Sequence, residues 1–333
     1  MDISILRRTL LGAVAAAAYG TLAAPALADD YPSRPVRVVV PFAAGNTLDQ
    51  ALRLVGEEFR KESGQNLIIE AKPGGGGIVA AQTVQTAKPD GYTVLLGSVS
   101  MMAANPHLYP NLPYKPLVDF RPVSNFLGAR LVLAVNTSAV KAKTLPEFVS
   151  WVKANPGKVS FASFTAGNSS HLSGLLLNER AGIDMTHVPH NGTPPAVQNL
   201  LGGHVQAAFL PLLAVKPQVA TGKVHVLANT GAERSAQMPD VPTFKELGYP
   251  DLEIYIWSTL MVPAGTPDAI VNRLHELMVK ALRSKSVTEK FAEWDFVAMP
   301  STPGETAKYI ADESRVWGKW AKLMLTDLKP QTN

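Results

Sequence analysis

Two short polar loops, far apart in the chain, occupy positions suited to holding an anion. The first is residues 41–49, Pro-Phe-Ala-Ala-Gly-Asn-Thr-Leu-Asp, and the second is residues 163–171, Ser-Phe-Thr-Ala-Gly-Asn-Ser-Ser-His. Each follows an apolar run that predicts a strand and leads into a helical pattern. The first N–H groups of a helix lack partners within it, and the positive helix end favours negative charge at the same spot. Two such loops predict two domains that hold one anionic ligand from opposite sides.

A third candidate segment follows the strand predicted at Thr93–Leu96, which ends at Gly97-Ser98. Ligands of α/β proteins bind beyond the carboxyl ends of strands. Ser98 and Ser100 lie in that position, so either serine is a candidate ligand contact.

Strand and helix patterns alternate along the chain, which indicates α/β architecture. Apolar residues from Leu48 to Phe59 recur at helical spacing, and Gly64 ends that helix. Residues 105–122 predict an ordered surface loop. The second half repeats the pattern, with strands and helices expected over residues 159–162, 172–181, 185–188, 194–201, 205–210, 213–221 and 224–228.

The order of these elements predicts a chain that leaves the first domain and later returns to it. Leu131–Val135 is expected to be a strand, and Leu252–Val262 is a long β-rich run. Crossings near Leu131 and Tyr255 would form a hinge, and hinge closure around a ligand is a known use of such a double connection. In the final helix, Trp317 and Trp320 are expected to pack internally.

The amino terminus has the features of an export signal. Residues 1–28 contain Arg7-Arg8, an apolar run over residues 10–22 and an Ala26-Leu27-Ala28 cleavage pattern. The run is short and rich in alanine for a membrane span, so an uncleaved membrane anchor is the less favoured alternative. Either a twin-arginine or an ordinary secretory signal fits, and both would export a mature chain that starts near Asp29.

Composition excludes several classes of site. The chain has no cysteine, which excludes thiol catalysis, cysteine lipidation and zinc–thiolate sites. The net charge of +4 comes from scattered residues, so no nucleic-acid surface is expected. Gly74–Gly77 lacks the lysine of a phosphate loop, and His187 and His190 lack the spacing of a metal motif. We therefore expect no cofactor and no metal.

Several segments together resemble the periplasmic solute-binding proteins of tripartite tricarboxylate transporters, the Bug or TctC-like family. Their order and spacing carry the resemblance over nearly the whole mature chain. The segments are Tyr31–Arg37, Val39–Phe42, Lys72–Gly74, Pro89–Thr93, Asn105-Pro106, Leu112–Tyr114, Ser169–Leu172, His187–Pro189, Leu200–Gly203, Pro239–Thr243 and Pro263–Pro267.

The resemblance implies a two-domain Venus-flytrap fold of the periplasmic-binding-protein type, without catalytic activity. Domain one would comprise residues 29–130 and 256–333, and domain two residues 131–255. The two loops would grip a carboxylate, and the loop at residues 190–192 would also reach the cleft. The ligand contacts expected besides Ser98 and Ser100 are Phe42, Ala44, Gly45, Asn46, Thr47, Asp49, Thr165, Ala166, Gly167, Asn168, Ser169, Ser170, His171 and Asn191.

The chain departs from the family pattern at informative positions. Asn46 replaces a glycine, so it would add a side-chain amide or occupy a left-handed turn position. Asp49 matches the family aspartate and would either contact ligand or cap its own helix. Gln206 and Leu210 replace residues that are often acidic or polar. Their character argues against an amino-acid ligand, whose ammonium needs a carboxylate partner.

These observations predict an exported monomeric receptor in the periplasm. It would bind a dicarboxylate, tricarboxylate or aromatic carboxylate and deliver it to the large and small subunits of a membrane transporter. One alternative is an accessory that presents the same ligand to a membrane sensor kinase. A second is an exported hydrolase using Ser169, Ser170 and His171, although these residues lack the nucleophile-elbow motif.

Overall fold

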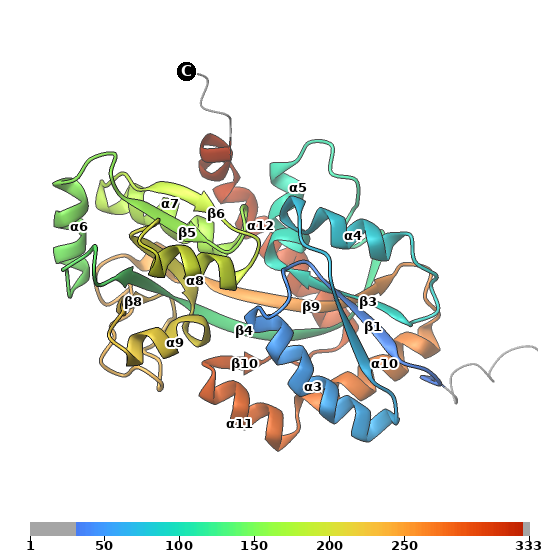
Figure 1. Cartoon of the computed structure of the whole chain (residues 1–333). Helices are drawn as coiled ribbons and strands as arrows, with labels where there is room; N and C mark the ends of the chain where they lie inside the picture. Colours follow the sequence, from blue (N-terminus) through green and yellow to red (C-terminus); the bar gives the residue numbers. More distant parts are fainter. Residues whose placement is uncertain (1–30, 329–333) are drawn as a thin grey trace, which may run out of the picture.

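The structure is a computed structural model that describes residues 31–328. The expected export signal, residues 1–28, lies outside the described residues. Within the described part, a ten-stranded sheet runs through both domains in the order β2-β1-β3-β9-β4-β7-β5-β6, and β8 and β10 also pair with β4. Helices lie around this sheet in both domains (Figure 1). No helix in residues 31–328 is both long and apolar enough to cross a membrane.

The first domain is built on three parallel strands, β2, β1 and β3, with β9 antiparallel to β3. Val36, Val38, Val39 and Val40 are fully or almost fully buried, as expected for a strand covered on both faces. The elements are β1 (Val36–Val40), α3 (Thr47–Ser63), β2 (Leu67–Ala71), α4 (Ile78–Gln85), β3 (Thr93–Ser98), α5 (Asn105–Leu108), β9 (Tyr255–Pro263), α10 (Asp268–Leu282), α11 (Lys285–Glu293), β10 (Phe296–Ala298) and α12 (Pro303–Leu328).

The second domain repeats the alternation of strand and helix. Strands β7, β5 and β6 are parallel, and β8 lies antiparallel to β4. The helix expected at Thr144 begins there, because its hydroxyl accepts the Glu147 N–H at 3.4 Å. The elements are α6 (Leu145–Lys153), β5 (Ser160–Ser163), α7 (Ser169–Ala181), β6 (Thr186–Pro189), α8 (Thr193–Leu201), β7 (Ala207–Pro211), α9 (Leu212–Ala220) and β8 (Val224–Asn229).

One long strand, β4 (Phe120–Asn136), belongs to both domains. It pairs with β9 up to Arg130 and with β7 and β8 beyond that residue. Beside it, the returning chain is held where Thr230 N–H donates to the Leu131 carbonyl at 2.9 Å. Figure 1 shows β4 and β9 side by side as they cross between the domains. Two adjacent strands therefore connect the domains, which is the fold the sequence predicts.

Three local expectations were wrong or incomplete. The expected surface loop at residues 105–122 contains helix α5, a buried Tyr114 and the start of β4. The strand expected at Leu131–Val135 is only the end of β4. The earlier part of β4 was not predicted, because proline, glycine and polar residues interrupt its apolar pattern over residues 120–130. Helix α11 and strand β10 were not predicted.

Candidate functional site

The first polar loop ends in an asparagine that caps helix α3. The Asn46 side-chain oxygen accepts the N–H groups of Leu48 at 2.8 Å and Asp49 at 3.2 Å. Its amide group donates to the Ala43 carbonyl at 2.7 Å. Asn46 has φ −70°, whereas Gly45 has φ 77°. The left-handed position is therefore Gly45, and the amide of Asn46 is used to build the loop.

Asp49 supports the same helix start. Its carboxylate accepts the Gly45 N–H at 3.1 Å and two hydrogen bonds from Arg53 at 3.2 Å. Of the two roles expected for this aspartate, these hydrogen bonds fit that of a residue stabilising its own helix.

The second loop is built in the same way at the start of α7. Asn168 accepts the His171 N–H at 3.0 Å, and the preceding Gly167 has φ 70°. A Cβ atom on Gly167 would lie 2.9 Å from the Leu108 side chain of the first domain, so this position requires glycine. The repeated Ala-Gly-Asn followed by a hydroxyl residue, at 44–47 and 166–169, is the sequence signal of this shared geometry.

A third helix start lies beside these two. Helix α8 begins at Thr193 after Gly192, and no side chain caps it. Pro194 and Pro195 follow, which is a recognised signal for a first helical turn. Next to it, the Asn191 carbonyl accepts the Ala43 N–H of the first loop at 3.3 Å. The sequence predicted Asn191 at the cleft and a helix over residues 194–201, but it did not place the start of that helix at the ligand site.

The three helix starts line one cavity of about 30 Å³ between the domains. None of its lining side chains is charged. Phe42 and Phe164 close part of its wall with their rings edge to face, 6.0 Å apart. The lining residues are Phe42, Asn46, Thr47, Leu48, Ser98, Val99 and Ser100 from the first domain, Phe164, Asn168, Gly192, Thr193 and Pro211 from the second, and Leu127, Ile256 and Trp257 from the crossing strands.

Two buried donors in this lining have no partner among the described residues. They are the Ser100 hydroxyl and the Asn168 amide nitrogen. Because the Asn168 oxygen already accepts the His171 N–H, its other end must be the NH₂ group, a donor. Buried donors normally find acceptors, since leaving one unpaired costs about 1–3 kcal/mol. The two donors come from different domains and line one cavity.

Several expected contact residues lie outside this lining and have other partners. The Ser169 hydroxyl donates to the Tyr255 carbonyl at 2.8 Å, and the Ser170 hydroxyl donates to the Phe209 carbonyl at 2.6 Å. The expected contacts absent from the lining are Ala44, Gly45, Asp49, Thr165, Ala166, Gly167, Ser169, Ser170, His171 and Asn191.

The buried His171 belongs to a hydrogen-bonded group that joins the two domains and also contains His187 and the more exposed Asp327. Its Nδ1 accepts the Gly167 N–H at 3.1 Å, and its Nε2 lies 3.0 Å from Asp327 Oδ2 on α12. His187 Nδ1 lies 3.0 Å from the same oxygen. Burial alone would raise the pKa of Asp327, but hydrogen bonds from both histidines outweigh it and hold that pKa well below its usual range. The role of Asp327 was not predicted from the sequence, because its partners His171 and His187 lie far away in the chain.

The same histidines do not form a metal centre. Their rings are stacked 3.8 Å apart at an interplanar angle of 9°. A metal about 2.0–2.1 Å from each nitrogen would have to lie near both ring planes, and two nearly parallel planes do not meet at such a point. Their nitrogens instead share one carboxylate oxygen by hydrogen bonding.

Ser163, His187 and Asp327 are arranged in a way that resembles a hydrolytic triad. Ser163 Oγ lies 2.7 Å from His187 Nε2, and His187 Nδ1 contacts Asp327. Ser163 is 0% exposed, however, so substrate could not reach its hydroxyl. The hydroxyls of Ser169 and Ser170, the serines considered from the sequence, donate to backbone carbonyls instead of to a histidine. The geometry therefore favours binding over hydrolysis.

Of the two departures from the family pattern in this segment, Gln206 lies just before β7 and Leu210 lies on it. Gln206 accepts the Ser160 N–H at 2.9 Å, at the amino end of β5. Leu210 is fully buried and pairs with Val132. Neither residue lines the cavity, and Pro211 is the residue of this segment that does.

Comparison with known proteins gives consistent matches. The family described as "Tripartite tricarboxylate transporter family receptor" matches residues 51–324. The chain is 36% identical to Protein BugT of Bordetella pertussis, covering 89% of this chain and 91% of that protein. It is similar to an R. palustris protein solved with adipate, at 31% identity and TM-score 0.85, covering 89% and 98% of the chains. It is also similar to MatC from Rhodopseudomonas palustris with bound malate, at 34% identity and TM-score 0.80, covering 87% and 100%.

Proposed function

Because the chain belongs to the tripartite tricarboxylate transporter receptor family, we propose that it captures a small carboxylate between its domains and delivers it to a transporter of that class. The observation that carries this proposal is the pair of unpartnered donors, Ser100 Oγ–H and Asn168 Nδ2–H, which belong to different domains and line one cavity. A carboxylate offers acceptors to both, so it would bridge the two domains.

Neutral donors and helix starts supply binding energy of the required order. Micromolar affinity needs about 8 kcal/mol. Each helix start contributes roughly 0.3–2 kcal/mol to a bound anion, and each hydrogen bond to a charged group about 1.5–3 kcal/mol. Three helix starts and two side-chain donors together can therefore supply a binding free energy of that size, without a charged side chain in the lining.

The remaining walls suit an apolar ligand body. Phe42, Phe164, Leu127 and Trp257 contribute aromatic and aliphatic surface to the cavity. This supports an aliphatic dicarboxylate or an aromatic carboxylate, and similar proteins have been solved with adipate and with malate. We propose that domain one comprises residues 29–130 and 256–333 and domain two residues 131–255. The mature protein would act as a periplasmic monomer without enzymatic activity.

A thermal-shift screen tests this function. Adipate, malate, citrate and terephthalate are the probes, and sucrose and choline are the uncharged and cationic controls. We expect at least one carboxylate to raise the melting temperature in a saturable way. Stabilisation by sucrose or choline with none by any carboxylate would overturn the proposal.

Transport is tested separately in cells. Deleting the gene should abolish uptake of the carboxylate found in the screen, and a plasmid copy should restore it. Unchanged uptake together with lost transcriptional induction would assign the receptor to a sensor kinase instead.

A further inference from the structure

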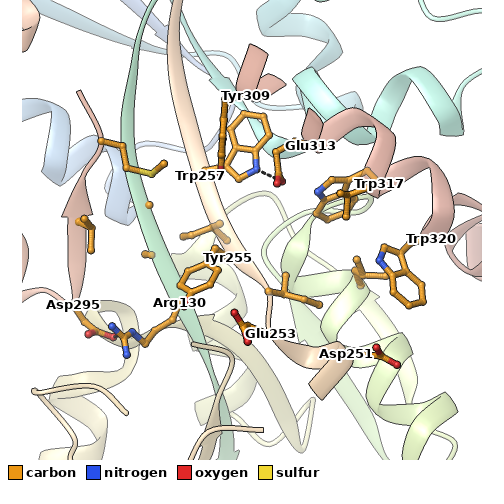
Figure 2. Close-up of a pocket in the computed structure, with 18 residues that line it drawn as sticks. Arg130, Asp251, Glu253, Tyr255, Trp257, Asp295, Tyr309, Glu313, Trp317 and Trp320 are labelled. Atoms are coloured by element: carbon orange, nitrogen blue, oxygen red, sulfur yellow. Dashed lines mark hydrogen bonds and ion pairs between the residues drawn. The ribbon is translucent and has the colours of Figure 1, made fainter. Parts of the chain in front are cut away.

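A second and larger cavity, of about 430 Å³, lies beside the crossing strands. We call it the aromatic pocket, and Figure 2 shows it. It shares Ile256 and Trp257 with the carboxylate cavity but none of the polar loop residues. Its volume falls within the range of small-molecule sites, about 300–1,000 Å³. Its walls come from β4, β9, β10 and α12, from Leu172 of α7, from Asp251, Glu253 and Ile254 ahead of β9, and from Asp295 and Met299 on either side of β10.

Aromatic side chains dominate one side of this pocket. Trp257, Trp317, Trp320, Tyr255 and Tyr309 line it, and Figure 2 shows them around the cavity. Trp317 is buried, as expected from its sequence position, but Trp320 is only partly buried. Three lining residues, at positions 255, 297 and 316, are among the exposed large hydrophobic residues of the described chain. Exposed apolar surface gathered in a concavity is typical of a binding site.

The charged residues of the pocket are mostly acidic. Its lining contains four carboxylates and only one cationic side chain, Arg130. Asp251 pairs with Arg180 at 2.7 Å, and Glu253 lies 3.5 Å from Lys245. The Glu313 carboxylate accepts the Trp257 indole N–H at 2.7 Å, and no ion pair to it exists within residues 31–328. Burial and the charge of Glu313 both raise the pKa of Tyr309 beside it.

A second acidic group in the pocket is buried and incompletely satisfied. The Asp295 side chain is only 7% exposed, and Arg130 Nε lies 3.4 Å from its Oδ2. That oxygen accepts no hydrogen bond from the described residues. Asp295 also has φ 62°, a conformation that non-glycine residues seldom adopt. The pocket therefore holds a buried acceptor as well as the Glu313 carboxylate, which has no cationic partner among the described residues.

We propose that the aromatic pocket binds a small organic ammonium ion with an apolar or aromatic body. The ammonium group would donate to the Glu313 carboxylate, and the tryptophan and tyrosine faces would attract its charge and cover its body. The excess of carboxylates over cations disfavours a carboxylate ligand here. This site is separate from the carboxylate cavity, and its occupancy does not depend on the function proposed above.

Tryptophan fluorescence provides the test, because three of the five tryptophans of the chain line the pocket. The purified mature protein is titrated with 2-phenylethylammonium and, as the uncharged analogue, with 2-phenylethanol. We expect a saturable change with the ammonium and at least about tenfold weaker binding of the alcohol. Glu313→Gln should weaken ammonium binding about tenfold or more. Asp312→Asn, one residue earlier on α12 and outside the lining, should leave it unchanged.

A second variant keeps the proposal testable if Glu313→Gln does not fold. Val316 is 45% exposed and lines the pocket, so Val316→Arg should fold normally and block ammonium binding by volume and charge. The proposal is overturned by no saturable change up to about 10 mM ammonium. Equal affinity for the alcohol, or unaltered ammonium affinity in both the Glu313 and Val316 variants, would also overturn it.

Discussion

At the scale of single residues, the oxygen and the nitrogen of the Asn168 side-chain amide have different roles. Its oxygen caps helix α7 through the His171 N–H, and its NH₂ group is the unpartnered donor in the cavity. Asn46 occupies the equivalent place in the first loop, but its NH₂ group donates to Ala43. The two loops share a sequence pattern, yet only the second leaves its amide donor free.

This difference predicts the effect of Asn168→Asp. Aspartate caps a helix start as well as asparagine does, so the melting temperature should change little. The new oxygen would face the ligand carboxylate and repel it, so carboxylate affinity should fall about 100-fold or more. Calorimetric titration with the carboxylate found in the screen measures this. An affinity within a factor of three of wild type would show that Asn168 does not contact the ligand.

A second residue-scale prediction concerns the other unpartnered donor. Ser100→Ala should weaken carboxylate binding about tenfold, because one hydrogen bond to a charged group is lost. The protein should become no less stable, since the hydroxyl has no partner among the described residues. Ser150→Ala, on the exposed side of α6, is the matched control. Equal affinities in the two variants would contradict the role assigned to Ser100.

At the scale of elements, the end of α12 ties the two domains together. This helix packs in the first domain but places Asp327 against His171 on α7 and His187 on β6. His171 in turn accepts the Gly167 N–H of the second loop. The last described turns of α12 therefore support the loop that carries Asn168.

The pH dependence of stability follows from these pKa shifts. Burial lowers the pKa of His187 below its ordinary value, although Asp327 opposes the shift, and burial also lowers the pKa of His190. Folding therefore favours the neutral form of both groups, so their contribution to stability is complete above about pH 6.5. It is lost as the pH falls through their lowered values. The Asp327 contribution persists until the pH falls below about 4.

We therefore expect the melting temperature to fall between pH 7.5 and pH 5.5. The fall should be smaller in His187→Gln, because that variant lacks one of the two titrating groups. His204→Gln, at an exposed position, should retain the full pH dependence. An identical slope in all three proteins would show that the buried histidine does not titrate on unfolding. Differential scanning calorimetry across this range makes the comparison.

At the scale of the whole molecule, the cavity is too small for the ligands proposed. A space of about 30 Å³ holds about two water molecules, at roughly 10–15 Å³ each. The Phe42–Phe164 contact and the Ala43–Asn191 hydrogen bond join the two loops across the cleft. The arrangement is therefore closed, and a dicarboxylate can enter only if the domains rotate apart about β4 and β9.

Small-angle scattering tests this movement. The ligand-free protein should have a larger radius of gyration than the closed arrangement, and the carboxylate from the thermal-shift screen should reduce it. Sucrose should leave it unchanged. A radius that matches the closed arrangement with and without the carboxylate would argue against hinge opening.

The sequence by itself determined the alternation of strands and helices, the two polar loops and the double crossing. These depend on apolar spacing, turn residues and caps, which act between neighbours in the chain. It also placed Asn46, Thr47, Ser98, Ser100 and Asn168 among the candidates that line the cavity. The patterns did not predict β10, α11 or the first half of β4, where polar residues and Pro122 obscure the period.

Only the tertiary structure decided which donors of the two loops remain free. Glycine and asparagine recur in both loops, but Ala43, Tyr255, Phe209 and Asp327 satisfy different groups in each. Tyr255, Phe209 and Asp327 lie outside the two loops, so their hydrogen bonds depend on how the chain packs, whereas Ala43 belongs to the first loop itself. Sequence patterns report local conformation, whereas an unpartnered buried donor is defined by everything packed around it.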